Sequence, residues 1–406
     1  MGLSVLTAAG QFSFVLALPL LSRLYSPTDF GLFTIYLSIV NICGPIVGLK
    51  FDSALFATTS RGEAGRVLAL TVLTMTIMTS VALVAWLAFS KTMIGPLGDA
   101  LRAAGVLMPF GILLSGLWSA SSAWAIRSNA IRTLSFARFM QPASMTLFQL
   151  VAGFFVPSGL TLILAHLASH VGYSGFIFAR TATRDALLAF RPRQWSKVLE
   201  LAHRQRRFPL YVLPAQVSAL LVMNLPPVLL SALYGTEIAG YCGVAYRIVA
   251  APIAIVSLPL GAILTGAISR SADIGAVRRS AREVFFANLL LVSVPVLLFS
   301  MLAPSLAGVA LGERWMVMGQ IIAAFALSGA AQAMRAPFAE ITSIFPFQKL
   351  RFAIEALSAA LVFGAIGVGA LEGWGALTTI WVMCAAGALG SLLAFVLLAI
   401  ALRNAG

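Results

Sequence analysis

The sequence predicts an all-α, polytopic membrane protein with about 12 transmembrane helices in two pseudo-symmetric six-helix lobes. Three observations support this fold class: an apolar composition, a series of apolar stretches of membrane-spanning length, and one motif that occurs twice. Hydrophobic residues make up 60% of the chain and charged residues 10%, whereas soluble domains have about 45–50% and about 25%. The excess apolar surface is therefore expected to face lipid.

Twelve stretches are apolar and about long enough for a helix to cross roughly 30 Å of hydrocarbon. They are residues 3–22, 31–57, 67–90, 103–124, 138–157, 159–179, 208–231, 239–268, 284–305, 316–337, 352–371 and 375–402. We expect helices rather than strands, because a helix satisfies its own backbone hydrogen bonds in lipid.

The motif at residues 20–31 recurs at residues 229–240, 209 positions later in a chain of 406 residues. Three leucines, a serine, a tyrosine and the closing glycine, Gly31 or Gly240, are identical in both copies. The offset predicts two lobes, 1–179 and 208–406, joined by a basic cytoplasmic linker at 180–207. Six spans in each lobe give a parallel repeat, related by an axis along the membrane normal.

Positive charge is concentrated on one side of the predicted topology. The net charge is +14, and 22 Lys and Arg residues follow even-numbered spans or lie in the C-terminal tail. The opposite loops hold four basic residues: Arg23, Lys91, Arg102 and Arg314. The basic side faces the cytoplasm, so both termini are expected there. The charge is a topology signal that also suits anionic membrane lipids, and no nucleic-acid partner is expected.

The sequence carries little sign of catalytic chemistry. Cys43, Cys242 and Cys384 fall in apolar spans, and the three histidines lack metal-ligand spacing with carboxylates. The sequence contains neither a phosphate-cradling glycine loop nor paired carboxylates in mid-membrane. We therefore expect no metal, no other cofactor and no enzymatic activity.

Charged residues inside the spans are the candidate ligand contacts. Arg247 lies about 10–12 Å from the outer face of span eight, at 1.5 Å per residue. An intramembrane arginine usually faces a cavity or a partner, so Arg247 could contact an anion, snorkel to the interface or form a structural pair. Lys50 and Asp52 in span two and Arg335 in span ten could bind ligand or simply mark the inner interface.

Two further features concern helix structure. Arg351 and Glu355 are four residues apart on span eleven and could pair. Prolines interrupt spans two and eight, which each follow a copy of the repeated motif, at Pro45 and at Pro252 or Pro259. Interrupted helices at corresponding places of two halves point to a transport site, and a kink compensated by packing is the alternative.

Four stretches resemble the Wzx-like oligosaccharide and polysaccharide flippases of the multidrug/oligosaccharidyl-lipid/polysaccharide (MOP) superfamily. They are residues 19–31, 207–211 entering span seven, 241–252 with Arg247 and Pro252, and 311–315 opening span ten. The resemblance covers nearly the whole chain and implies a MATE/MOP-like fold in the bacterial inner membrane. Family members usually carry a basic stretch before span one, whereas this chain begins almost inside it, which leaves a longer natural N-terminus open.

The resemblance further implies flipping of an undecaprenyl-diphosphate-linked oligosaccharide to the periplasmic leaflet by alternating access. The cargo would be a repeat unit of O-antigen, capsule or exopolysaccharide, as in lipopolysaccharide biosynthesis. Its headgroup needs a cationic, polar cavity. The expected substrate-binding residues are Arg247, Lys50, Asp52, Arg335, Asn224, Tyr246 and Gln11. The expected partners are the lipid-linked oligosaccharide, membrane lipids, and the polysaccharide polymerase and glycosyltransferases of the same pathway.

Three other function classes stay open at this point. A MATE-like exporter of drugs or small molecules would want a mid-membrane carboxylate for cation coupling. A membrane-bound sugar polymerase or ligase would need a substantial outer catalytic loop. A receptor or scaffold is the third class, and the two-fold repeat argues for alternating access instead.

Overall fold

The computed structural model describes residues 2–58, 60–89, 92, 95–181, 189–191, 194–270, 274–338 and 348–404. Within these ranges the chain is helical and contains no strand, which confirms the predicted all-α fold. The chain forms two compact units, which we call unit 1 and unit 2. Unit 1 joins Met1–Pro27 to Tyr241–Gly406, and unit 2 is Thr28–Gly240.

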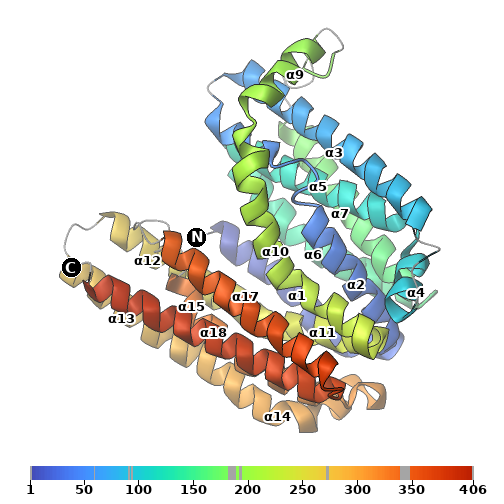
Figure 1. The fold of residues 1–406 in the computed structure, drawn as a ribbon, viewed down its shortest axis with the longest axis vertical. Helices are drawn as coiled ribbons and strands as arrows, with labels where there is room; N and C mark the ends of the chain where they lie inside the picture. The colour runs from blue at the N-terminus through green and yellow to red at the C-terminus, as the bar shows by residue number, and fades with distance from the viewer. Residues whose placement is uncertain are drawn as a thin grey trace. The chain divides into compact units, whose positions relative to one another are not determined.

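Figure 1 shows the helices of both units. Those of unit 2 are α2 (Pro27–Cys43), η1 (Phe51–Ala57), α3 (Arg61–Phe89), α4 (Gly95–Ala104), α5 (Leu107–Arg127), α6 (Ile131–Gly153), α7 (Gly159–Thr181), α9 (Trp195–Arg204), η3 (Phe208–Val212) and α10 (Leu213–Tyr234). Those of unit 1 are α1 (Gly2–Leu24), α11 (Thr236–Pro252), η4 (Ile253–Ser257), α12 (Leu258–Arg270), α13 (Ile274–Asn288), η5 (Leu289–Ser293), α14 (Val294–Leu311), η6 (Glu313–Trp315), α15 (Met318–Arg335), η7 (Ala336–Phe338), α17 (Gln348–Leu371) and α18 (Ala376–Asn404).

The apolar helices make this a multi-pass membrane protein. By length and composition, seven described helices can cross a membrane, or nine if each of two bent pairs forms one span. The bends are 70° between Gly95–Ala104 and Leu107–Arg127, and 46° between Phe208–Ser218 and Leu220–Tyr234. Phe12–Leu24 and Pro27–Cys43 are apolar but shorter. Every one of the 12 predicted stretches contains a helix, in agreement with the predicted architecture.

α2 stops at Cys43 for a local reason. Pro45 has no backbone N–H and cannot continue the helical hydrogen-bond ladder. The chain turns through Leu49 and Lys50, which have φ angles of 49° and 59°, and re-forms as the 3₁₀ helix η1. A Cβ on Gly44 would overlap the Ser115 side chain of α5, so the glycine lets the broken end pack directly on α5.

α11 repeats α2 in the second half of the chain. Both helices have 17 residues, and they begin at Pro27 and Thr236, the same 209-residue offset as the motif. α11 ends at Pro252 and passes into the π-helical turn η4. The interruptions predicted for spans two and eight therefore occur at equivalent positions, although one is a break and the other a π-turn.

The first helix of each predicted lobe groups with the other half of the chain. α1 packs against α14, α12 and η4 within unit 1, and α10 packs against α4 within unit 2. The units therefore differ from the sequence segments 1–179 and 208–406. The chain passes from one unit to the other directly after α1 and just after α10, within the two copies of the repeated motif. The division into transport lobes stays a prediction.

Candidate functional site

Arg247 lies on α11 in unit 1, inside the helix rather than at its end. Its guanidinium carbon is 4.6 Å from the centroid of the Phe14 ring on α1, and Phe14 is 5% exposed. A cation over an aromatic face is attracted by the ring quadrupole, more strongly where water is excluded. The guanidinium is thus held against α1 by the Phe14 ring.

Lys50 and Asp52 form a buried ion pair in the break after α2. Lys50 Nζ is 3.7 Å from Asp52 Oδ1, and the two side chains are 11% and 7% exposed. The hydroxyl of Ser119 on α5 donates to Asp52 Oδ2 at 2.8 Å, and the backbone N–H of Ser53 donates to Oδ1 at 3.0 Å. The carboxylate is therefore satisfied by three groups that lie within unit 2, and it ties the broken helix to α5.

Arg335 pairs with a carboxylate from another helix. Its Nη1 lies 2.7 Å from Oε1 of Glu355 on α17. The sequence offered Arg351, four residues before Glu355, as the partner. The side chain of Arg351 lies outside the described residues, so its pairing with Glu355 stays a prediction. The pair of Arg335 and Glu355 links the cytoplasmic ends predicted for spans ten and eleven.

The remaining predicted substrate-binding residues are Asn224, Tyr246 and Gln11. Asn224 donates from Nδ2 to the Leu220 carbonyl of its own helix α10 at 3.0 Å. Tyr246 is half-buried on α11, next to Arg247. Gln11 lies on α1, and its side chain is outside the described residues. Arg184 and Arg193 of the basic linker are also outside the described residues. Arg247, Tyr246 and Arg335 belong to unit 1, whereas Lys50, Asp52 and Asn224 belong to unit 2.

Sequence reasoning missed how three resembling stretches meet in unit 1. Trp315, fully buried, donates from its indole nitrogen to the Ser22 carbonyl at 2.9 Å. The Tyr241 hydroxyl donates to the Arg314 carbonyl at 3.0 Å, and the Tyr241 and Trp315 rings lie 5.7 Å apart, edge to face. These motif residues anchor the end of α1 to η6 and α11. Their role in the structure is to fix the helix ends.

A second buried polar group lies beside the π-turns of unit 1. Asn288, 1% exposed, accepts from the Ser257 hydroxyl at 2.7 Å and donates to the Ala333 carbonyl at 2.6 Å. Ser257 ends η4 and Asn288 precedes η5. A π-turn leaves backbone groups out of the regular ladder, and these side chains join the interrupted helices to α15. No signal in the sequence separated Asn288 from other polar residues.

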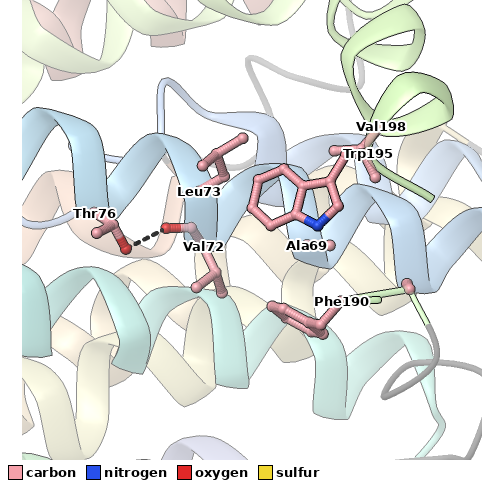
Figure 2. Close-up of a pocket in the computed structure, with 8 residues that line it drawn as sticks. Ala69, Val72, Leu73, Thr76, Phe190, Trp195 and Val198 are labelled. Atoms are coloured by element: carbon pink, nitrogen blue, oxygen red, sulfur yellow. Dashed lines mark hydrogen bonds between the residues drawn. The ribbon is translucent and has the colours of Figure 1, made fainter. Parts of the chain in front are cut away.

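Unit 2 contains an apolar cavity of about 170 Å³ between α3 and the amphipathic helix α9. Figure 2 shows the Trp195 indole and the Phe190 ring on either side of it, with Val72 and Leu73 from α3. The Thr76 hydroxyl donates a hydrogen bond to the Val72 carbonyl at 2.9 Å. The described lining carries no charged side chain, so the cavity does not suit a diphosphate headgroup.

Two histidines, His166 and His170, lie on α7. No group of three His, Cys, Asp or Glu side chains among the described residues could hold a metal ion. His166 and His170 are nevertheless buried and in contact, with ring centroids 4.1 Å apart. Their spacing of four residues indicates in the sequence that they are neighbours on one face of a helix. Tyr36 and Gln141, which contact them, come from other helices.

Comparison with known proteins identifies the family to which this chain is similar and the solved structures that share its fold. The family model described as "Polysaccharide biosynthesis protein" matches residues 20–320. No curated protein matches the chain significantly.

Several solved structures share the fold. Lipid II flippase MurJ, in an inward closed conformation, superposes with a TM-score of 0.74 at 11% identity, covering 96% of this chain and 86% of MurJ. An inward-facing MATE-family multidrug transporter of the MOP superfamily gives 0.64 at 13%, covering 99% and 94%. A MOP-superfamily transporter from Pyrococcus furiosus gives 0.58 at 13%, covering 99% and 95%. At these identities the likeness concerns the fold, and it confirms the MATE/MOP-like architecture predicted from the sequence.

Proposed function

This chain belongs to the polysaccharide biosynthesis protein family, and from that premise we propose that it is a flippase for undecaprenyl-diphosphate-linked oligosaccharide. It would move a repeat unit of O-antigen, capsule or exopolysaccharide from the cytoplasmic to the periplasmic leaflet of the bacterial inner membrane by alternating access. The observation that carries the proposal is the combination of a polysaccharide family model over residues 20–320 with the fold of MurJ, described as a lipid II flippase. The glycosyltransferases and polymerase of the pathway would be its functional partners.

The chemistry of the cargo explains why the fold suits it. An isoprenoid chain can stay in the bilayer while a protein cavity carries only the diphosphate-sugar headgroup. The headgroup needs cations with donors for phosphate oxygens, and arginine offers a planar, bidentate fork. Arg247 is our preferred phosphate contact, because it lies inside a membrane helix and its guanidinium is held over the Phe14 ring.

The alternative is a MATE-like exporter of small molecules, which the similarity to a multidrug transporter favours. Cation-coupled export of a cationic drug would use a membrane-embedded carboxylate. Asp52 is a buried carboxylate, and it is already bound to Lys50, Ser119 and the Ser53 backbone. We therefore rank glycolipid flipping above drug export.

The test is reconstitution of the purified full chain in liposomes with an undecaprenyl-diphosphate oligosaccharide that carries a fluorescent sugar. A membrane-impermeant enzyme that modifies the sugar reports how much of it reaches the outer leaflet. Arg247→Ala should lower the flipping rate by about 10- to 100-fold, since a hydrogen bond to a charged group contributes about 1.5–3 kcal/mol. Arg247→Lys should retain part of the rate, because lysine keeps the charge and loses the fork.

Arg180→Ala is the matched control. The Arg180 guanidinium also lies over a phenylalanine, 5.3 Å from the centroid of Phe176, but Arg180 is exposed at the end of α7. The Arg180→Ala variant should leave the flipping rate unchanged. Wild-type flipping by Arg247→Ala would contradict the assigned role. Phe14→Leu removes the ring and keeps the cation, so it should lower the flipping rate less than Arg247→Ala does. Drug efflux without glycolipid flipping by the wild type would favour the exporter.

A further inference from the structure

Two of the three histidines in the chain form a buried pair in unit 2. His166 and His170 are 5% and 8% exposed, lie one turn apart on α7, and have ring planes 38° apart. Buried histidines of this kind need polar partners, because an unsatisfied ring nitrogen is costly. The third histidine, His203, is exposed on α9, and it therefore provides an internal reference.

The pair is enclosed by polar and aromatic groups from three other helices. The Tyr36 hydroxyl of α2 is 3.1 Å from His166 Nδ1. Gln141 of α6 donates from Nε2 to Ser169 Oγ at 3.0 Å, and the Ser169 hydroxyl donates to the His166 carbonyl at 2.8 Å. The Trp118 ring of α5 lies edge to face with His170, with centroids 5.8 Å apart. The pair is thus surrounded by hydrogen-bonding groups and an aromatic ring.

Several charged groups of the packed elements bond to partners outside the pair. Asp29 at the start of α2 accepts from the Gly159 N–H at 2.7 Å, and Arg127 at the end of α5 donates to Thr58. Asp99 and Arg102 of α4 pair with each other. Arg132 and Arg138 lie in the first turns of α6, and Arg180 ends α7 over Phe176. From α2, the titratable side chain facing the pair is Tyr36.

His170 Nδ1 has two neighbours that require opposite roles. It lies 3.1 Å from the His166 carbonyl oxygen, which only accepts, and 3.4 Å from Gln141 Nε2, which only donates. With a proton on Nδ1 the ring donates to the carbonyl. Without one, its lone pair accepts from Gln141. Both tautomers of the neutral ring and the protonated ring therefore each have a hydrogen-bond partner at Nδ1.

The contact between the rings limits the pair to a single charge. Two imidazolium ions with centroids 4.1 Å apart would repel strongly in a buried site, so binding of the first proton opposes the second. Histidine is the side chain whose unperturbed titration lies nearest physiological pH. Burial disfavours the imidazolium form, so the pair is suited to take up a proton when the protein opens the site to water and to release it when the site closes.

From this geometry we propose that His166 and His170 are a proton-binding site that couples the flippase to the transmembrane proton gradient. This inference rests on the proposed flippase function for its purpose, whereas proton binding by the pair is tested independently. Tyr36 and Gln141 are positioning residues that hold the two rings.

Proton binding is measured on the full chain in lipid nanodiscs, with the three histidines labelled for NMR and titrated from pH 4 to pH 9. His203→Asn, His166→Asn and His170→Asn assign the signals. His166 and His170 should shift together in one step, and removing either should move the midpoint of the other by about one pH unit or more, as for coupled sites.

The transport arm uses the reconstituted flippase with an imposed proton gradient. The gradient should change the flipping rate of the wild type and of His203→Asn, whereas His166→Asn/His170→Asn should lose this response at equal protein content. Constant His166 and His170 signals over the whole pH range would overturn the proton site. So would titrations that do not depend on each other, or an unchanged gradient response in the double variant. If even the wild type flips no glycolipid, the proposed function is wrong, and the NMR titration still decides the site.

Discussion

At the scale of single residues, Gly31 shows why one member of the repeated motif is a glycine. A Cβ at this position would overlap the Thr236 carbonyl oxygen and lie 2.8 Å from Thr236 Cγ2. Thr236 belongs to the second copy of the motif, and both residues lie in unit 2. The starts of α2 and α11 therefore touch each other through a position that has no room for a side chain.

Gly31→Ala should destabilise the protein by about 1–3 kcal/mol, the usual cost of overpacking. Gly172→Ala is the matched control, because Gly172 is also helical and a Cβ there meets nothing within 4 Å. Alanine is the better helix former, so the control should keep or raise the melting temperature. Thermal unfolding of the purified variants in detergent measures both. An equal melting temperature for the two variants would contradict the close contact.

The charged residues also show how context decides a role. Lys50 with Asp52 and Arg335 with Glu355 are ion pairs, which makes them parts of the scaffold before they are considered as ligands. A buried charge that loses its partner is costly. Variants of these four residues are therefore expected to affect protein yield, whereas Arg247 is the residue at which binding is tested.

At the scale of elements, α9 is the one described helix of the basic linker. Its Val198 and Leu201 are buried while Leu199 is 59% exposed. Val198 packs into a cluster with Phe51 of η1 and with α3 residues, and Figure 2 shows it beside Trp195 at the cavity. The apolar side of α9 thus packs on the N-terminal half of α3, and the linker is partly a folded element.

Two leucines on α9 make a matched test of this packing. Leu201→Ala should cost about 2–5 kcal/mol, the range for a buried leucine, because Leu201 is 6% exposed. Leu199→Ala removes the same atoms from an exposed position and should leave the unfolding midpoint nearly unchanged. The measurement is thermal unfolding followed by intrinsic fluorescence. A larger loss for Leu199→Ala would mean that the opposite face of α9 is the packed one.

Interrupted helices are the second theme at this scale. α2 breaks after Cys43 and α11 passes into η4 after Pro252, equivalent positions under the 209-residue offset. Proline removes a backbone donor in both neighbourhoods. Different side chains stabilise the two interruptions. In unit 2, Asp52 pairs with Lys50 and accepts from Ser119, and in unit 1, Asn288 bonds to Ser257 and to the Ala333 carbonyl. The duplicated design has diverged in its packing.

At the scale of the whole molecule, the charge distribution leads to a topology that can be tested. The prediction rests on 22 basic residues on one side against four on the other and on the positive-inside rule. Reporter fusions after Arg193 and after Arg403 should both report the cytoplasm, in a pair of an alkaline phosphatase and a fluorescent protein. A periplasmic signal from either fusion would break the twelve-span topology.

The sequence by itself determined the fold class, the twelve apolar stretches and the repeat. These follow from composition and spacing along the chain, because lipid selects apolar helices segment by segment whatever their neighbours are. The equal lengths of α2 and α11 confirm that the 209-residue offset is structural. The position of Arg247 within an apolar stretch likewise predicted that it lies inside a helix.

Only the tertiary structure decided which side chains meet. The contacts of Phe14 with Arg247, of Arg335 with Glu355 and of Tyr36 with His166 each join different helices. The grouping of α1 with Tyr241–Gly406 is of the same kind. Such contacts depend on which faces of the helices pack together, and in a chain that is apolar on nearly every face, hydrophobic periodicity does not mark them.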